Sequence, residues 1–401
     1  MGKACVLAYS GGLDTSVAIG WLRDKFGFDV IALAVDVGQG VDHDALVARG
    51  TACGASETIV VDAREEFARD FVLRALRANA LYMGKYPLVS ALSRPVIVKH
   101  LVRVARELGA PAVAHGCTGK GNDQVRFEVS AAALAPNIEV IAPVRDAGLT
   151  RDAAISYAEE RGIPIPVTKS HPYSIDENLW GRTIECGVIE DPWVSPPSDA
   201  YAWTRGPQDA PDEPESVVIG FDGGVPSSLD GSSMPLVDLI GRVAQRAGVH
   251  GVGRIDMIED RLVGIKSREI YEVPAALTLI AAHRDLEDLT LERSLGAYKR
   301  HVEPTYAELV YNGLWYSPLR LALDAFIDAS QVHVTGEVRL RLHKGSANVE
   351  GRRSPKALYS HSLATYESGD LFDHDAAAGF VRLWGLPVKV WAEKQPPEER
   401  P

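Results

Sequence analysis

Apolar and polar positions alternate in a repeating way over the first 165 residues. Short apolar runs predict strands at Ala4–Ala8, Val30–Val35, Thr58–Val61, Ala112–Ala114 and Ile138–Ile141. Amphipathic stretches between them predict helices at Thr15–Lys25, His43–Ala52, Arg64–Ala80, Arg94–Leu108 and Asp123–Leu134, with another opening at Thr150. Buried strands that alternate with helices are typical of βαβ units and parallel sheets. The pattern predicts an α/β domain, residues 1–165, with a doubly wound five-stranded parallel sheet.

The pattern changes at Gly162–Pro166, where two prolines disfavour both a helix and a central strand. We place a domain junction there and predict an α+β domain over residues 166–360. Its expected elements are a strand at Val217–Phe221, a helix at Leu236–Ala247, a hairpin of Ile255–Arg261 and Lys266–Glu272, a largely helical region Pro274–Asp324, and a strand pair that begins in Val332–Leu342. Leu309–Tyr316 is apolar around most of its circumference, which predicts a buried helix.

Residues 361–401 form a third predicted part. A helix is expected at about His374–Gly385, and the apolar residues Leu386–Trp391 follow it in an otherwise polar tail. An apolar arm of this kind commonly packs on another subunit, so we expect the C-terminal helix to serve oligomerisation. Glu393–Pro401 is polar and is expected to be disordered.

Composition narrows the class of protein. A chain of 401 residues favours two domains, and a formal net charge of −12 disfavours a broad nucleic-acid surface. The four cysteines show no C-x-x-C spacing, so neither a disulfide framework nor a resident metal site is predicted. No apolar run approaches ~20 residues, and Val6 stands where a myristoylation signal needs Ser or Thr. We expect a soluble, cytoplasmic protein without a membrane or nucleic-acid partner.

The first candidate site follows the first strand. The run is Ala8-Tyr9-Ser10-Gly11-Gly12-Leu13-Asp14-Thr15-Ser16, which places a glycine turn between a strand and the start of a helix. Backbone N–H groups and the helix dipole attract an anion there, and glycines let a phosphate approach the main chain. Asp14 fits beside phosphates if it caps the loop's own N–H groups or faces a bridging Mg²⁺ ion. The structural alternative is a turn that only opens a helix.

The spacing of this loop excludes two common nucleotide sites. G-x-x-x-x-G-K-[ST] is absent, and the G-x-G-x-x-G fingerprint does not fit. The string S-G-G-x-D-[ST]-S instead resembles the pyrophosphate loop of the ATP pyrophosphatases. That resemblance implies cleavage of ATP between its α and β phosphates and activation of a substrate as an adenylate.

A second polar run, His115–Phe127, lies between an expected strand and an expected helix. Thr118 and Asn122 can form neutral hydrogen bonds, and Asp123 can accept a hydrogen bond from an amine. Arg126 can bind a carboxylate through two parallel hydrogen bonds. A polar surface loop that caps the next helix is the structural alternative. Because parallel strands end at one edge of their sheet, this run is predicted to lie near the first loop.

Three strings together resemble the argininosuccinate synthase family. They are A-Y-S-G-G-L-D-T-S near the N-terminus, G-C-T-G-K-G-N-D-Q-V-R-F-E in the middle, and S-I-D-E-N-L-W-G-R further on. The resemblance runs from about residue 4 to about residue 385. It implies that ATP adenylates the ureido oxygen of citrulline with release of diphosphate, after which the amine of aspartate displaces AMP. It also implies a homotetramer that exchanges C-terminal segments.

The resemblance also implies a set of site residues. It assigns ATP to Ala8, Tyr9, Ser10, Gly11, Gly12, Leu13, Asp14, Thr15 and Ser16, with Val35 and Gly116. It assigns citrulline to Tyr86, Ala91, Asn122, Arg126, Ser174, Thr183, Glu259 and Tyr271. It assigns aspartate to Thr118, Asn122 and Asp123, leaves Asp14 as the candidate catalytic residue, and implies Mg²⁺ bound with ATP.

Two of these assignments have alternatives in the sequence itself. The family often carries serine at position 91, so Ala91 can offer only a backbone contact, and Ser90 is a possible substitute. Ser174 and Glu177 also match a capping box, S-x-x-E, which would open a helix instead.

The implied mechanism depends on positioning and charge stabilisation, with closure between domains to exclude water. A tRNA-thiolating enzyme would need catalytic cysteines and a basic surface, and we expect neither in this sequence. A glutamine-dependent amidating enzyme would need a glutaminase domain, for which we find no N-terminal cysteine nucleophile. An ATP-binding sensor of the same fold would bind nucleotide without turnover, and substrate-dependent hydrolysis separates it from the ligase.

Overall fold

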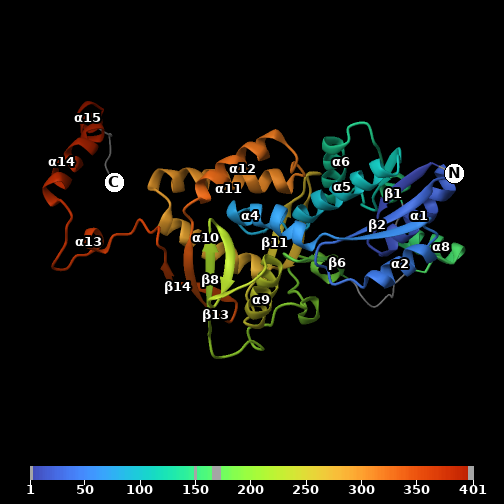
Figure 1. Ribbon diagram of the computed structural model, residues 1–401, viewed down its shortest axis with the longest axis horizontal. Helices are drawn as coiled ribbons and strands as arrows, with labels where there is room; N and C mark the ends of the chain where they lie inside the picture. Colours follow the sequence, from blue (N-terminus) through green and yellow to red (C-terminus); the bar gives the residue numbers. More distant parts are fainter. Residues whose placement is uncertain (1–2, 149–150, 165–172, 396–401) are drawn as a thin grey trace. The chain divides into compact units, whose positions relative to one another are not determined.

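The computed structural model describes residues 3–148, 151–164 and 173–395 (Figure 1). The chain forms two compact units, Met1–Lys356 and Ala357–Pro401. Among the described residues, no helix is both long and apolar enough to cross a membrane. Thr150, where a helix was expected to start, lies outside the described residues. So do residues 165–166, the last two of the expected domain junction. The predicted domain boundaries stay a prediction.

A five-stranded parallel sheet forms the N-terminal part of the first unit, as predicted. Its strands are β1 (Ala4–Ala8), β2 (Asp29–Asp36), β3 (Glu57–Asp62), β4 (Ala112–Ala114) and β5 (Glu139–Ile141), in the order β3-β2-β1-β4-β5. Every adjacent pair is parallel. The chain runs outward from β1 to β3 and then crosses to the other side of β1 with β4. The loops after β1 and β4 therefore flank the point where strand order reverses, which is where open α/β sheets bind ligands.

Helices cover both faces of this sheet, which confirms the doubly wound arrangement. The helices are α1 (Leu13–Phe26), α2 (His43–Ala52), α5 (Val89–Glu107), α6 (Asp123–Leu134), α7 (Pro143–Asp146) and α8 (Arg151–Arg161). Alternate residues of β1 point to opposite faces. Cys5 and Leu7 share a core with α1, whereas Val6 and Ala8 share a core with α5.

Two expected helices differ in detail from the prediction. The stretch predicted as one helix, Arg64–Ala80, consists of α3 (Arg64–Glu66), a π-helical segment η1 (Phe67–Val72) and α4 (Leu73–Arg77). Helix α5 begins at Val89, before the expected Arg94. Tyr86 explains the early start, because its hydroxyl accepts a hydrogen bond from the backbone N–H of Ser90 (2.9 Å) and satisfies a donor of the first turn.

Two antiparallel sheets follow. The first has strands β6 (Ser174–Asn178), β7 (Gly181–Glu185), β11 (Arg254–Asp260) and β12 (Lys266–Glu272), in the order β11-β12-β7-β6. The second has β8 (Glu215–Asp222), β9 (Val225–Leu229), β10 (Ser232–Ser233), β13 (Gly336–His343) and β14 (Ser346–Arg353), in the order β10-β9-β8-β13-β14. Ser174 begins a strand, so the capping-box alternative is wrong. Short 3₁₀ turns, η2 (Gly187–Glu190) and η3 (Ser198–Ala200), lie between β7 and β8.

Helices α9 (Leu236–Val249), α10 (Pro274–Thr290), α11 (Arg293–Tyr311) and α12 (Pro318–Gln331) complete the first unit. Their apolar residues join β8, β13 and the α5 face of the parallel sheet in one continuous core. The expected helix Leu309–Tyr316 is only partly present. Helix α11 ends at Tyr311, and Gly313, whose φ of 76° suits glycine, turns the chain away. Tyr311 and Trp315 are nevertheless buried.

The second unit contains α13 (His361–Ala364), α14 (His374–Trp384) and α15 (Leu386–Lys394). The apolar arm Leu386–Trp391 is thus helical, and Glu393 belongs to α15 rather than to a disordered tail. Residues 396–401 lie outside the described residues. Several large apolar side chains of α14 and α15 are exposed within the chain: Phe380, Val381, Leu383, Trp384, Leu386, Val388, Val390 and Trp391.

Candidate functional site

The loop after β1 is held in shape by its own small side chains. Ser10 Oγ lies 3.2 Å from Thr15 Oγ1, and the Thr15 hydroxyl donates to the carbonyl of Gly12 (3.3 Å). Gly11 has a φ of 77°, and Arg49 of α2 donates to its carbonyl oxygen (3.0 Å). Gly12 is the N-cap residue of α1, and its backbone N–H donates to the Ser10 hydroxyl (3.4 Å), so the loop leads directly into the anion-attracting end of the helix.

The loops after β1 and β4 approach each other closely. A Cβ atom on Gly116 would lie 2.9 Å from Thr15 Cγ2 and 3.6 Å from Asp14 Cβ. Any larger residue at position 116 would have to displace the Thr15 side chain. Val35, at the end of neighbouring β2, is buried and pairs with Val61 of β3. The structure therefore brings the predicted nucleotide residues Ala8–Ser16, Val35 and Gly116 to one edge of the sheet.

Strand register gathers the second group of predicted residues on one face of the antiparallel sheet. Asp176 of β6 pairs with Thr183 of β7, and Thr183 pairs in turn with Tyr271 of β12. Directly opposed residues share a face, as do residues two apart along a strand. Steps of two residues along β6 and β11 place Ser174 and Glu259 on that face as well.

Glu259 lies at the centre of an aromatic cluster. Its carboxylate accepts hydrogen bonds from the hydroxyls of Tyr271 (2.7 Å) and Tyr311 (2.9 Å). The ring of Tyr86 stacks on that of Tyr271, with 4.2 Å between centroids. Burial raises the pKa of Glu259, and the two tyrosine hydroxyls and Arg126 oppose that rise. The cluster thus holds a buried acidic group beside aromatic walls.

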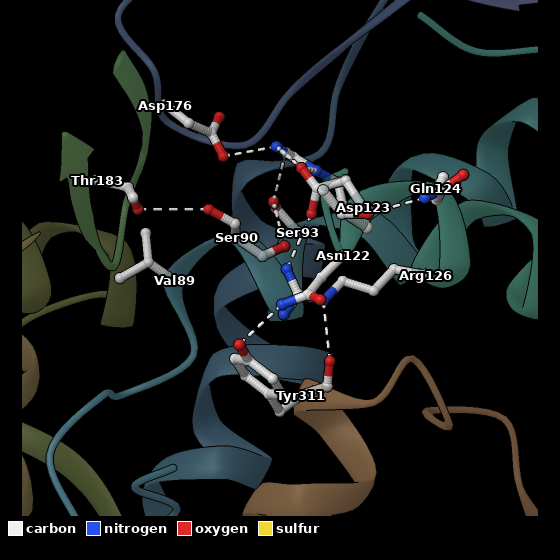
Figure 2. A network of polar contacts seen from close by, with 12 residues as sticks. Val89, Ser90, Ser93, Asn122, Asp123, Gln124, Arg126, Asp176, Thr183 and Tyr311 are labelled. Carbon is white, nitrogen blue, oxygen red and sulfur yellow. Dashed lines mark hydrogen bonds and ion pairs between the residues drawn. The ribbon is translucent and has the colours of Figure 1, made fainter. Parts of the chain in front are cut away.

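Tyr311 joins this cluster to the start of α6 (Figure 2). The Asn122 amide donates to the Tyr311 hydroxyl (2.8 Å), and its carbonyl oxygen accepts the backbone N–H of Leu262 (2.9 Å). Arg126 donates Nε to the Tyr311 carbonyl (3.0 Å) and Nη1 to Asp123 (2.9 Å). Those two bonds use two of the five guanidinium donors. Asn122 and Arg126 are both buried, so their orientations are fixed by the fold.

Asp123 is a carboxylate held between two arginines. Arg126 contacts one oxygen, and Arg94 donates to the other through Nε (2.9 Å) and Nη2 (2.7 Å). Burial favours the neutral form of Asp123, but the charges of Arg94 and Arg126 prevail and lower its pKa to about 2. A carboxyl group with so low a pKa stays ionised at neutral pH and is a weak base.

The remaining predicted residues differ in how far they are exposed to solvent. Ala91 is fully buried in the first turn of α5, whereas the neighbouring Ser90 hydroxyl lies 3.4 Å from that of Thr183. Ser90 is thus the residue of this pair whose polar side chain contacts a predicted citrulline residue. Thr118 is exposed on the loop after β4, and Ser174 is exposed near the start of β6.

Sequence reasoning missed three residues of this site. Arg94 bonds to both Asp123 and Asp176, and Tyr311 contacts Asn122, Arg126 and Glu259. Asp176 lies inside a string that was quoted for the family resemblance, so it was within reach, whereas Arg94 entered only as the first residue of a predicted helix. Tyr311 stood in a segment interpreted only as a buried helix, and nothing in its sequence neighbourhood indicates a polar role.

The described residues contain no group of three or more His, Cys, Asp or Glu side chains that could hold a metal ion. Asp14 is the carboxylate closest in sequence to the glycine turn, and it lies on the first turn of α1. One carboxylate that acts together with substrate phosphates suits Mg²⁺, which keeps several water ligands and rarely has an all-protein cage.

Three features define an α/β nucleotide-binding protein with an added antiparallel domain: the reversed strand order, the glycine turn that opens helix α1, and the second polar loop beside that turn. Comparison with known proteins gives the family. Residues 4–164 match a model described as "Arginosuccinate synthase N-terminal HUP domain", and residues 173–391 match "Arginosuccinate synthase C-terminal domain". The chain belongs to the argininosuccinate synthase family.

Curated relatives agree with the family models. Argininosuccinate synthase of Brevibacillus brevis is 59% identical over 97% of this chain and 93% of that relative. The enzymes of Ligilactobacillus salivarius and Symbiobacterium thermophilum, also named argininosuccinate synthase, are 58% and 59% identical over 98% of both chains. A solved 4-thiouridine synthetase–RNA complex with ATP aligns over 42% of this chain and 48% of its own, at 18% identity and a TM-score of 0.30, which is too low to support an argument.

Proposed function

We propose that this protein is an ATP-dependent ligase that joins citrulline to aspartate, forms argininosuccinate and releases AMP and diphosphate in arginine biosynthesis. Membership of the family supports this activity. The observation that carries it is that the glycine loop suited to phosphates lies against the loop after β4, and that hydrogen bonds connect the residues following that second loop to the aromatic cluster around Glu259. These charged and aromatic side chains suit two amino acids. An ATP-binding site alone would not need the second of these.

The first step is an attack of the citrulline ureido oxygen on the α-phosphorus of ATP, with diphosphate as leaving group. Residues Ala8–Ser16 hold the phosphates through backbone N–H groups and hydroxyls, while Val35 and Gly116 border the nucleoside. Mg²⁺, bound by the phosphates and Asp14, would neutralise the departing diphosphate. Asp14 is therefore the candidate catalytic residue.

Citrulline presents an ammonium, a carboxylate and a neutral ureido group. Arg126, which retains unused donors, suits the carboxylate, and Glu259 suits the ammonium. Tyr86, Asn122, Thr183, Tyr271 and Ser174 supply walls and neutral hydrogen bonds. At position 91 only a backbone contact is available, so Ser90, which faces Thr183, takes the side-chain role.

The second step is an attack of the aspartate amine on the activated ureido carbon, with AMP as leaving group. Thr118, Asn122 and Asp123 hold aspartate. Because Asp123 is a weak base, it anchors the ammonium group and does not accept the proton of the attacking amine. The adenylate must be kept from water until aspartate attacks, so the domains close over it.

The exposed apolar faces of α14 and α15 support assembly with further copies of this chain, as a homotetramer in the cytoplasm. Trp384→Glu would place a charge on such a face and is expected to yield smaller species in light scattering coupled to size exclusion. Lys389→Glu, a charge change at an already polar position, is the control. An unchanged mass for the Trp384 variant would contradict this role of α14.

The direct test measures AMP and diphosphate released from Mg-ATP by the purified protein. Citrulline and aspartate are added singly and together. Rapid AMP release only with both substrates is expected for the ligase. Nucleotide binding with no AMP under any combination would contradict the proposal and favour an ATP-binding sensor.

A further inference from the structure

Arg94 has two acidic partners on separate elements, Asp123 of α6 and Asp176 of β6, both labelled in Figure 2. It lies in the second turn of α5, and its side chain is only 14% exposed. Besides its two bonds to Asp123, it donates Nη2 to Asp176 Oδ2 (2.6 Å) and Nη1 to the Ser93 hydroxyl (3.1 Å). The side chain therefore ties the first residue of α6 to strand β6.

The two partners of Arg94 belong to the two halves of the proposed site. Asp123 follows the loop after β4 and is assigned to aspartate. Asp176 pairs with Thr183, which pairs with Tyr271, so it continues the row of residues assigned to citrulline. Arg94 is thus a direct link between the aspartate side and the citrulline side.

The geometry of Asp123 leaves room for one more donor. An ionised carboxylate offers about four lone-pair directions. Three of these directions are already taken by N–H groups, two from Arg94 and one from Arg126. A substrate ammonium can take the remaining direction, and the two arginines determine where that direction points.

We propose that Arg94 is a positioning residue for the second step, fixing the Asp123 carboxylate relative to the citrulline row so that the aspartate amine faces the activated carbon. This inference rests on the proposed ligase function. The first step, in which diphosphate leaves, does not need Asp123 in that position. Loss of Arg94 should therefore separate the two steps.

The experiment compares the two steps in Arg94→Lys and Arg94→Gln. Citrulline-dependent exchange of labelled diphosphate into ATP, without aspartate, reports the first step. AMP formation against aspartate concentration reports the complete reaction. For Arg94→Gln we expect exchange within about twofold of wild type and a KM for aspartate raised about 10-fold or more, as expected when a charge-assisted hydrogen bond is lost.

Arg94→Lys keeps the positive charge but lacks the guanidinium group that reaches both carboxylates. We therefore expect the KM for aspartate to rise less in Arg94→Lys than in Arg94→Gln. Asp176→Asn keeps the bonds to Asp123 and should change the aspartate KM less than Arg94→Gln. Arg103→Lys is the matched control, because Arg103 lies on the same helix and pairs at the surface with Glu107 (2.8 Å). It should leave both reactions unchanged.

Two results would overturn the assignment. Equal losses of exchange and AMP formation in Arg94→Gln, with a lower melting temperature, would show that Arg94 only holds the fold together. An unchanged aspartate KM would show that it does not position Asp123. A wild-type protein that neither exchanges diphosphate nor forms AMP would instead overturn the ligase proposal itself, and this role of Arg94 with it.

Discussion

The loops after β1 and β4 lie at one edge of the same sheet, yet they are built differently. The first is shaped mainly by residues within its own run, such as Ser10, Gly12 and Thr15, with one further bond from Arg49. The second depends on partners far away in sequence, because Asn122 bonds to Tyr311, 189 residues further on. The proposed phosphate loop is therefore mainly a local motif, whereas the second loop needs tertiary contacts to fix its side chains.

The largest expected effect comes from the first loop. Asp14→Asn removes the proposed carboxylate for Mg²⁺ and should lower citrulline-dependent diphosphate exchange on the order of 100-fold. The melting temperature should change little, because asparagine has nearly the same size as Asp14 and keeps an oxygen acceptor at this half-buried position. Asp24→Asn, at the other end of the same helix, is the control. Normal exchange by the Asp14 variant would refute its assignment.

Tyr311→Phe tests the second region. It removes the hydroxyl that accepts from Asn122 and donates to Glu259, and leaving such buried groups unpaired costs about 1–3 kcal/mol. The KM for citrulline should rise about 10-fold. Steady-state kinetics with saturating ATP and aspartate measure it, and the exposed Tyr298 of the same helix provides a control as Tyr298→Phe. An unchanged KM would mean that the cluster does not bind citrulline.

Gly116→Ala tests whether the two regions depend on each other. Its added methyl group would press on Thr15 at 2.9 Å, and such overpacking costs about 1 kcal/mol or more, or roughly fivefold in affinity. ATP affinity, measured by titration calorimetry, should weaken accordingly. Gly241→Ala, where the methyl group meets nothing within 4 Å, is the matched control. Equal ATP affinity in both variants would show that the loops move independently.

The last expected effect concerns stability rather than activity and is a dependence of the melting temperature on pH. Burial, with the nearby charges of Glu185 and Glu259, raises the pKa of Glu269 from 4.5 to about 8. The folded protein therefore keeps this proton at pH values where the unfolded chain has lost it, so stability falls as pH rises from about 4.5 to about 8. Melting temperatures across this range should fall less in Glu269→Gln than in wild type. Parallel curves for the two proteins would contradict the raised pKa.

The same contrast explains what the sequence could predict. Strand–helix alternation revealed the parallel sheet, because its central strands β1, β2 and β4 are buried on both faces and keep continuous apolar runs. The loop at Ala8–Ser16 was recognisable because its functional groups are consecutive. Val35 and Gly116 were assigned through the family resemblance, and their positions follow from strand ends at one sheet edge.

The rest of the site depends on tertiary contacts that no local pattern encodes. Tyr311 could not be predicted as a polar residue, because its role depends on Asn122 and Glu259 in distant segments. Ser174 could not be separated from a helix cap, since strand or helix there is decided by pairing with β7. The early start of α5 likewise depends on the Tyr86 hydroxyl, which reaches Ser90 only after the chain turns back.

The most direct test of the ligase account follows one oxygen atom. Citrulline labelled with a heavy oxygen isotope in its ureido group is incubated with the wild-type protein, ATP and aspartate, and the AMP is analysed by mass spectrometry. If the ureido oxygen attacks the α-phosphorus, one labelled oxygen should appear in each AMP formed. AMP without the label, or the label retained in the amino-acid product, would contradict activation of citrulline as an adenylate.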